Sequence, residues 1–255
     1  MRLVRFRTHA GDFWGEFDPD GITPLIGDPF GRFRRDSQRY LHGDVRLLAP
    51  VKPSKIICVG LNYHAHVAES HTADEAPAEP LLFLKPPSSI IGPGEAIELP
   101  PSSSQVEFEG ELALVIRRQV RRVSPVEAEE AIYGITCAND VTARDFQRSD
   151  KQWARAKGFD TFCPVGPWVC VGEDFTGLQL ETLVDMELRQ RATVDDMIFS
   201  PSELVSFISA IMTLEPGDLI LTGTPAGVGP LQPGNQVEVR IENIGSLVND
   251  VRAAH

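Results

Sequence analysis

The sequence predicts an α+β protein in which short strands outnumber helices. Three observations support this class. Short β-branched and aliphatic runs alternate with turns rich in proline, glycine and aspartate along most of the 255 residues. Two segments begin with Ser-Pro and carry glutamate three positions after the serine, a spacing typical of a helix start. Two prolines near residue 50 indicate a linker, so we predict a small N-terminal β-unit at 1–50 and a larger domain at 51–255.

Composition narrows the class of partner. The chain is 42% hydrophobic, which is ordinary for a protein with a full core, and its net charge is −12. That charge argues against nucleic acid and anionic membranes as partners, because both require a basic surface. No signal peptide and no long apolar run is evident, so a cytoplasmic location is expected. The four cysteines lie among apolar residues without Cys-x-x-Cys spacing and are predicted to be buried free thiols.

The N-terminal unit and the start of the large domain both contain clear strand patterns. Leu3–Phe6 and Phe13–Phe17 are predicted strands, and the following Asp-Pro-Asp-Gly supplies a turn. Lys55–Asn62 and Leu81–Lys85 are predicted strands of the large domain.

A short helix is expected between these last two strands. His66 and Glu69 are three residues apart, so they share a face of that helix. The polar, acidic run Ser70–Glu79 that follows is expected to be mobile. The pair is either an ordinary surface pair or an acid–base couple on a lid.

Val106–Arg117 is predicted to be a buried strand, and it carries three alternating glutamates. Successive strand side chains point to opposite faces, so Glu107, Glu109 and Glu111 should lie on one side. Two such charges a few Å apart repel by roughly 1 kcal/mol in water and more near a protein interior. The three glutamates either face solvent at a strand end or share a divalent cation.

The second half of the chain contains further strands and one clear amphipathic helix. Ile135–Asp145 is a strand whose polar end includes Asp140, and residues 146–157 are helical or irregular. Strands are expected at 168–171, 178–190, 219–221, 237–242 and 247–251. The helix that starts at Ser200 should bury one apolar stripe, which consists of Leu204, Phe207, Ile208, Ile211 and Met212.

The segment Thr222–Gly229 is rich in glycine and follows a strand. It lacks the Gly-Lys-Ser/Thr of a phosphate loop, so nucleotide binding is not predicted. A backbone that approaches a small anionic ligand fits the segment.

In order and spacing, these motifs resemble the fumarylacetoacetate hydrolase family from about residue 53 to residue 252. The motifs that carry the resemblance are Gly60-Leu-Asn-Tyr-His-Ala-His-Val-Ala-Glu69, Phe83-Leu-Lys-Pro86, Glu107-Phe-Glu-Gly-Glu-Leu112, Ala138-Asn-Asp-Val-Thr-Ala-Arg-Asp145, Lys157-Gly-Phe-Asp-Thr-Phe-Cys-Pro-Val-Gly-Pro167 and Thr222-Gly-Thr-Pro-Ala-Gly-Val-Gly229.

The resemblance implies a mixed β-sandwich roll that usually forms a homodimer and binds Mg²⁺, Mn²⁺ or Ca²⁺. By the same resemblance, the metal ligands are Glu109, Glu111 and Asp140, with Glu107 outside the ligand set. The other residues that it implicates are the catalytic His66, Glu69 and Lys157 and the substrate-binding Arg144, Gln147 and Thr224.

Two departures from the family pattern matter. The usual Asn-Gly hairpin is replaced by Asp185-Met186, which puts the local sheet geometry in doubt. Gly158 stands where relatives often carry serine after the lysine, so one polar contact is missing.

The function that the resemblance implies is divalent-metal-dependent hydrolysis of a C–C bond in a small anionic 2-oxo acid. Acylpyruvate and fumarylacetoacetate are the substrate types, and the reaction passes through an enolate that the metal stabilises. Isomerisation or decarboxylation of substrates such as 2-hydroxyhepta-2,4-diene-1,7-dioate, in aromatic-compound catabolism, is the alternative, since these reactions require the same enolate. A non-catalytic binding protein with this fold is a third hypothesis, against which the retained polar residues argue.

Overall fold

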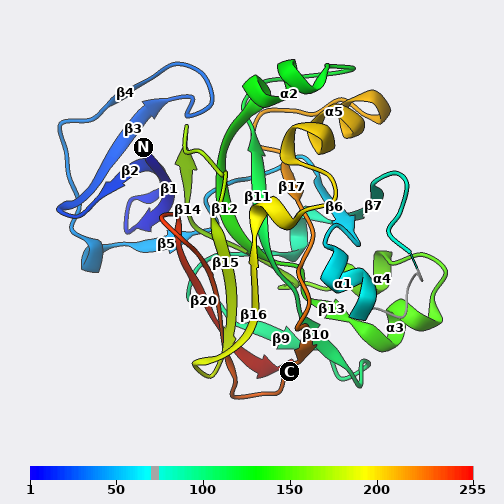
Figure 1. Ribbon diagram of the computed structural model, residues 1–255. Helices are drawn as coiled ribbons and strands as arrows, with labels where there is room; N and C mark the ends of the chain where they lie inside the picture. The colour runs from blue at the N-terminus through cyan, green and yellow to red at the C-terminus, as the bar shows by residue number, and fades with distance from the viewer. Residues whose placement is uncertain (70–74, 255) are drawn as a thin grey trace.

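The computed structural model describes residues 1–69 and 75–254 and confirms the α+β class. Three sheets form most of the molecule, and short helices lie at their ends (Figure 1). The largest sheet has twelve strands: β1 (Arg2–Thr8), β2 (Gly11–Asp18), β3 (Gly21–Gly27), β4 (Phe33–Arg35), β5 (Arg46–Leu48), β6 (Ile56–Gly60), β7 (Leu81–Lys85), β8 (Ile90–Ile91), β11 (Gly110–Ile116), β12 (Ile132–Asn139), β14 (Cys163–Val171) and β17 (Leu219–Leu221).

The remaining elements are two smaller sheets and the helices. The five-stranded sheet consists of β9 (Ile97–Leu99), β15 (Gln179–Val184), β16 (Glu187–Thr193), β19 (Gln236–Ile241) and β20 (Gly245–Ala253). The three-stranded sheet consists of β10 (Val106–Phe108), β13 (Thr142–Ala143) and β18 (Gly229–Pro230). The α-helices are α1 (His64–Glu69), α2 (Pro125–Ala131), α3 (Arg144–Ser149), α4 (Ala154–Lys157) and α5 (Pro201–Ile211), and single 3₁₀ turns occupy His42–Asp44, Pro87–Ser89 and Val194–Asp196.

The two larger sheets are mixed, and the largest one has both faces buried. Antiparallel neighbours dominate, but β17 pairs with β6 in parallel and β20 pairs with β9 in parallel. Ile57 and Val59 point into the core shared with the five-stranded sheet, whereas Ile56 and Cys58 point into a second core on the opposite face. Burial on both faces explains why the central strands are nearly continuous apolar runs.

The N-terminal segment forms a meander that joins the large sheet at its edge. Strand β1 pairs with β14, and β2, β3 and β4 follow outward from β1 (Figure 1). Trp14, Phe30 and Phe33 pack against the second core. Residues 1–50 therefore extend the main sheet at its edge and cover part of one face.

The helix over 201–211 begins as predicted but buries a different stripe. Ser200 and Glu203 form a capping box, and Leu204 and Ile208 are fully buried. The prediction for Ile211 was wrong, because its side chain is 59% exposed in the last turn, and Val205 is buried in its place. The buried stripe is therefore rotated toward α2, against which α5 packs.

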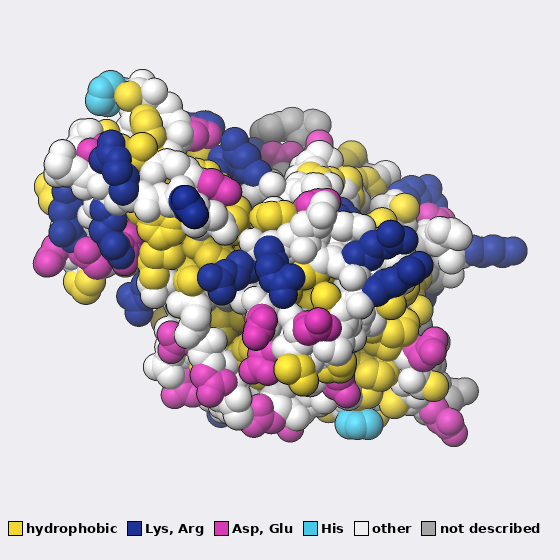
Figure 2. Space-filling view, turned by 90° about the horizontal axis from the view of Figure 1, so that it is seen from above, with side chains coloured by type: hydrophobic (Ala, Val, Ile, Leu, Met, Phe, Trp, Pro, Cys, Tyr) yellow, Lys and Arg dark blue, Asp and Glu magenta, His cyan; other side chains and the backbone are white. Residues whose placement is uncertain are grey.

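All four cysteines are buried and free, as expected. Within the described part of the chain, no helix has the length and apolar character that a membrane span requires. On the face seen in Figure 2, many basic side chains lie in a band across the middle of the view, and acidic side chains are more frequent toward its lower edge.

The β15–β16 hairpin forms despite the missing Asn-Gly. Asp185 and Met186 both adopt positive φ, 51° and 67°, as a type I′ turn requires. The Asp185 carboxylate accepts hydrogen bonds from the Gln236 amide and the Asn235 side chain at 2.8 and 2.7 Å. These two hydrogen bonds compensate part of the free energy that positive φ costs at Asp185 and Met186. The two-residue turn therefore forms without Asn-Gly, which answers the question about the local sheet geometry.

Met186→Gly should therefore stabilise the protein. The Met186 side chain is 88% exposed, so its removal forfeits little packing, and glycine adopts positive φ without steric cost. We expect a gain of roughly 0.5–1 kcal/mol in the free energy of unfolding, measured by urea titration. Leu41→Gly is the matched control: Leu41 is 64% exposed at φ −74°, and the change should destabilise. A loss of stability in Met186→Gly would contradict the strain assigned to this turn.

Candidate active site

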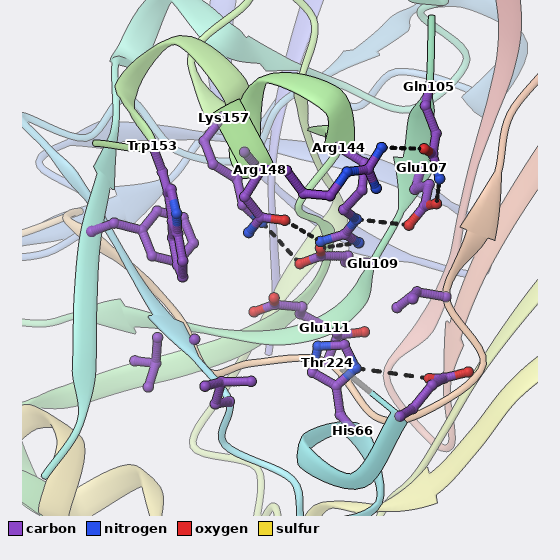
Figure 3. Close-up of a pocket in the computed structure, with 17 residues that line it drawn as sticks. His66, Gln105, Glu107, Glu109, Glu111, Arg144, Arg148, Trp153, Lys157 and Thr224 are labelled. Carbon is purple, nitrogen blue, oxygen red and sulfur yellow. Dashed lines mark hydrogen bonds and ion pairs between the residues drawn. The ribbon is translucent and has the colours of Figure 1, made fainter. Parts of the chain in front are cut away.

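A cavity of about 590 Å³ lies where α1, α3 and α4 meet the ends of the central strands (Figure 3). The sequence-predicted residues that line it are His66, Glu69, Glu109, Glu111, Arg144, Gln147, Lys157 and Thr224. Asp140 is completely buried and contacts two lysines beside the cavity. The structure thus brings all nine predicted site residues into one region.

The acidic cluster is built by two antiparallel neighbours, β11 and β12. Glu109 immediately precedes β11, and Asp140 immediately follows β12, so the two residues lie at the same end of this strand pair. The Asp140 amide donates to the Glu109 carbonyl at 2.8 Å and fixes this arrangement. The carboxylates of Glu109, Glu111 and Asp140 each offer an oxygen, and these oxygens lie within 4.8 Å of one another.

The predicted single strand over 106–117 is interrupted at Glu109. Residues before the break belong to β10 in the three-stranded sheet, and residues after it belong to β11 in the large sheet. Gly110, the first residue of β11, must be glycine because a β-carbon there would lie 1.9 Å from the Thr182 hydroxyl. The expectation of one continuous strand was wrong, yet all three glutamates still line one cavity.

The carboxylate cluster fits a divalent cation. Glu111 is 1% exposed and accepts a hydrogen bond from the Gly223 amide at 2.7 Å. Burial, together with Asp140 and Glu109, raises the pKa of Glu111 well above its ordinary value, so its charge lacks compensation. Mg²⁺ and Ca²⁺ bind carboxylate oxygens at roughly 2.0–2.6 Å, so oxygens of one site lie at most about 5 Å apart. The oxygens here lie within 4.8 Å of one another and meet that limit.

Two buried lysines bind carboxylates of the acidic cluster. Lys157 Nζ donates to Glu109 Oε2 at 2.9 Å and to Asp140 Oδ2 at 2.6 Å. Lys85 Nζ donates to the other oxygen, Asp140 Oδ1, at 2.6 Å. Burial alone would lower the pKa of Lys157, but Asp140 and Glu109 raise it above its ordinary value, so the lysine is a fixed cation. From the sequence, Lys85 was identified only as the lysine that ends an apolar strand, and its contact with Asp140 was not predicted.

Arg144 organises the opposite side of the cluster. Its guanidinium donates to Glu107 at 2.8 Å, to Glu109 at 2.7 Å and to the Gln147 side-chain carbonyl at 2.5 Å (Figure 3). Burial favours a lower pKa for Arg144, but Glu109 and Glu107 raise it. Glu107 is therefore neutralised by Arg144, outside the three-carboxylate cluster.

Despite sharing the cavity, His66 and Glu69 are not hydrogen-bonded. His66 Nδ1 lies 3.9 Å from Glu69 Oε2, and that oxygen accepts from the Gly227 amide at 2.8 Å. Among residues 1–69 and 75–254, Nδ1 of His66 has no hydrogen-bond partner although it is buried. Burial lowers the pKa of His66, so the imidazole is neutral at pH 7.

The glycine-rich segment contacts the protein's own polar groups. The amides of Gly223 and Gly227 donate to Glu111 and Glu69, as described above. Thr224 donates to the Gly110 carbonyl at 2.9 Å and accepts from Gln190 at 2.7 Å. Gln190 was not predicted as a site residue, because its partners are remote in sequence. The segment positions carboxylates at the cavity.

Two other expectations concern the cavity wall. A β-carbon at Gly158 would lie 2.4 Å from the Ala154 carbonyl, so the backbone here requires glycine and leaves no room for the serine of relatives. The expected mobile segment Ser70–Glu79 falls partly on residues 70–74, which lie outside the described residues.

The mixed sheets and the buried carboxylate cluster in a cavity define the class: an enzyme fold with its site at the strand ends. The chain belongs to the fumarylacetoacetate hydrolase family. The family model described as "Fumarylacetoacetate (FAA) hydrolase C-terminal" matches residues 55–252, and "Rv2993c-like, N-terminal" matches residues 1–50. This family is enzymatic and includes hydrolases, isomerases and tautomerases.

Curated relatives are similar to this chain along nearly its whole length. Protein Rv2993c of Mycobacterium tuberculosis is 51% identical, over 98% of both chains. Oxaloacetate tautomerase FAHD2B, mitochondrial, of Bos taurus is 41% identical, over 98% of this chain and 91% of the relative.

Two solved structures are similar in fold. The 2-hydroxyhepta-2,4-diene-1,7-dioate isomerase from Mycobacterium marinum has a TM-score of 0.91 at 46% identity, over 99% of this chain and 98% of the other. Maleylpyruvate hydrolase from Sphingobium sp. SYK-6, solved with manganese(II) and pyruvate, has a TM-score of 0.83 at 30% identity, over all of both chains.

Proposed function

We propose that this chain enolises a 2-oxo acid and thereby acts as a keto–enol tautomerase or isomerase. The observation that carries the proposal is a buried imidazole whose Nδ1 has no hydrogen-bond partner among the described residues. It lines the cavity beside three carboxylates suited to a cation. The relatives at 41% and 46% identity bear tautomerase and isomerase names, which supports this choice.

Glu109, Glu111 and Asp140 would hold the metal, for which we propose Mg²⁺ or Mn²⁺. When bound, the ion supplies Lewis-acid polarisation of the keto group and a chelation site for the 2-oxo acid. Lys157 keeps a positive charge beside these carboxylates, where negative charge would develop on the keto oxygen.

His66 is the proposed base. Its pKa is lowered by burial, so the neutral form that accepts a proton is present at pH 7. Nδ1, which has no hydrogen-bond partner in the part of the chain that the structure describes, would take a proton from the carbon next to the keto group and return it. Arg144, Gln147 and Thr224 line the remaining wall and are proposed substrate contacts.

The second candidate is C–C bond hydrolysis of an acylpyruvate-like or fumarylacetoacetate-like substrate, the reaction that the sequence analysis placed first. The observation in its favour is Glu69, which lies beside His66 on α1 and could orient the imidazole for proton abstraction from water. Homodimer assembly and a cytoplasmic location stay predictions.

Two assays of the purified protein test the proposal. Oxaloacetate enolisation and acetylpyruvate cleavage should be followed by absorbance, each with Mg²⁺, with Mn²⁺ and with a chelator. We expect metal-dependent enolisation that is faster than cleavage, and a loss of about 100-fold or more in His66→Ala. Faster cleavage than enolisation would favour the hydrolase, and metal-independent rates in both assays would refute both candidates.

A further inference from the structure

Arg148 is the basic residue of the cavity that the acidic cluster does not engage. The lysines and arginines that line the cavity are Arg144, Arg148 and Lys157. Arg144 contacts Glu107 and Glu109, and Lys157 contacts Glu109 and Asp140, as described above. Within the described residues, no carboxylate lies within 4.0 Å of the Arg148 guanidinium, whose one polar contact is the Gln105 side-chain carbonyl at 2.7 Å. Its charge is therefore available to a ligand.

Gln105 holds Arg148 in place. The Gln105 amide nitrogen donates to Glu107 Oε1 at 2.5 Å, so its carbonyl oxygen must face the other way, toward Arg148 (Figure 3). A flipped amide would set its oxygen against a carboxylate and its NH₂ against a guanidinium, and both contacts would be lost. The guanidinium is thus oriented without being neutralised.

The position of Arg148 relative to the acidic cluster is set by α3. Arg148 follows Arg144 by four residues on this helix, so the two share a face about one turn, or roughly 5.4 Å, apart. Arg144 contacts Glu109 of the cluster directly. A ligand whose 2-oxo acid end lies at the cluster and whose chain runs along α3 would place its far end near Arg148.

We propose that Arg148 binds the second carboxylate of a dicarboxylic 2-oxo acid and so selects diacids over neutral-tailed 2-oxo acids. This inference rests on the proposed function, since it requires the first end of the substrate to bind at the acidic cluster. A planar guanidinium with free N–H groups suits a carboxylate, which it can bind through two parallel hydrogen bonds. A neutral acyl tail would offer no negative charge to the Arg148 guanidinium.

Binding of a matched ligand pair tests the assignment. N-oxalylglycine carries a chelating oxalyl end and a distal carboxylate, whereas N-propyloxamate has the same oxalyl end and an uncharged tail. Their affinities should be measured by calorimetry in the presence of Mg²⁺ for the unchanged protein and for Arg148→Gln and Arg148→Lys. Arg155→Gln is the matched control, since Arg155 is exposed, pairs with Asp150 and does not line the cavity.

We expect Arg148→Gln to weaken N-oxalylglycine about tenfold and to leave N-propyloxamate within about twofold. Arg148→Lys should recover part of the loss, and Arg155→Gln should change neither affinity. Equal losses for both ligands would overturn the assignment and leave Arg148 as a structural contact of Gln105. Oxalate, measured in the same way, tests the chelating end alone. If the unchanged protein does not bind oxalate, the proposed function is refuted instead.

Discussion

We expect Glu69→Gln to lower any C–C hydrolytic activity by roughly two to four orders of magnitude, the usual range for loss of acid–base assistance. The substitution isolates the charge, because the glutamine carbonyl can still accept the hydrogen bond that the Gly227 amide donates to Glu69. Metal affinity should be unchanged, since Glu69 is not part of the three-carboxylate cluster. Acetylpyruvate cleavage and oxaloacetate enolisation by the same variant provide the measurement.

The two rates of Glu69→Gln separate the candidate reactions. A tautomerase needs His66 but no positioned water, so enolisation should fall much less than cleavage. Glu130→Gln on the exposed face of α2 is the control and should leave both rates unchanged. Cleavage that survives Glu69→Gln intact would exclude the hydrolase assignment and leave the tautomerase or isomerase.

The second large effect concerns stability without metal. Asp140→Asn should destabilise the chelator-treated protein by about 3–5 kcal/mol, because Lys85 and Lys157 would keep buried charges whose shared partner is lost. Glu111→Gln should leave its stability unchanged or raise it, since this carboxylate faces two others and its Gly223 contact survives in glutamine. Two substitutions that each replace a buried carboxyl group by an amide thus have opposite expected effects.

Thermal unfolding with and without Mg²⁺ completes this test. At a metal concentration 100 times the dissociation constant, binding should stabilise the unchanged protein by about 2.7 kcal/mol. That gain should disappear in both Asp140→Asn and Glu111→Gln if each residue binds the ion. A full metal-dependent shift in either variant would remove that residue from the ligand set.

The pH dependence of the metal-free protein has a definite sign at Glu111. Its folded pKa is raised above the ordinary value of 4.5, so the folded state retains a proton that the unfolded state has lost. Stability from this group therefore falls as pH rises from about 4.5 through the folded pKa. Glu111→Gln should flatten that fall, and an unaltered slope in the variant would contradict the burial assigned to this carboxylate.

Local chemistry was enough to predict most elements from the sequence. The capping boxes at Ser124 and Ser200 form as their spacing predicts, because each depends only on residues three apart. The strand patterns of Ile56–Gly60 and Leu81–Lys85 are similarly local. The motif order indicated the family, which the family model then showed.

Tertiary structure decided what depends on distant residues. The carboxylate strand breaks at Glu109 because its two halves pair with distant partners in different sheets, and Thr182 leaves no room for a side chain at Gly110. Which helical stripe of α5 is buried was decided by packing against other elements, α2 among them. The hairpin at Asp185-Met186 survives because Asn235 and Gln236, about fifty residues away, support it.

The same division holds for the candidate site. The sequence by itself determined which carboxylates are too close to one another to remain uncompensated, because alternation along a strand is a local property. Only the fold decided that Lys85 donates a hydrogen bond to Asp140 and that Arg144 neutralises Glu107. It also decided that Arg148 has no carboxylate partner among the described residues and contacts Gln105 instead. Long side chains find their partners through space, and no pattern along the chain encodes the place where their charged ends meet.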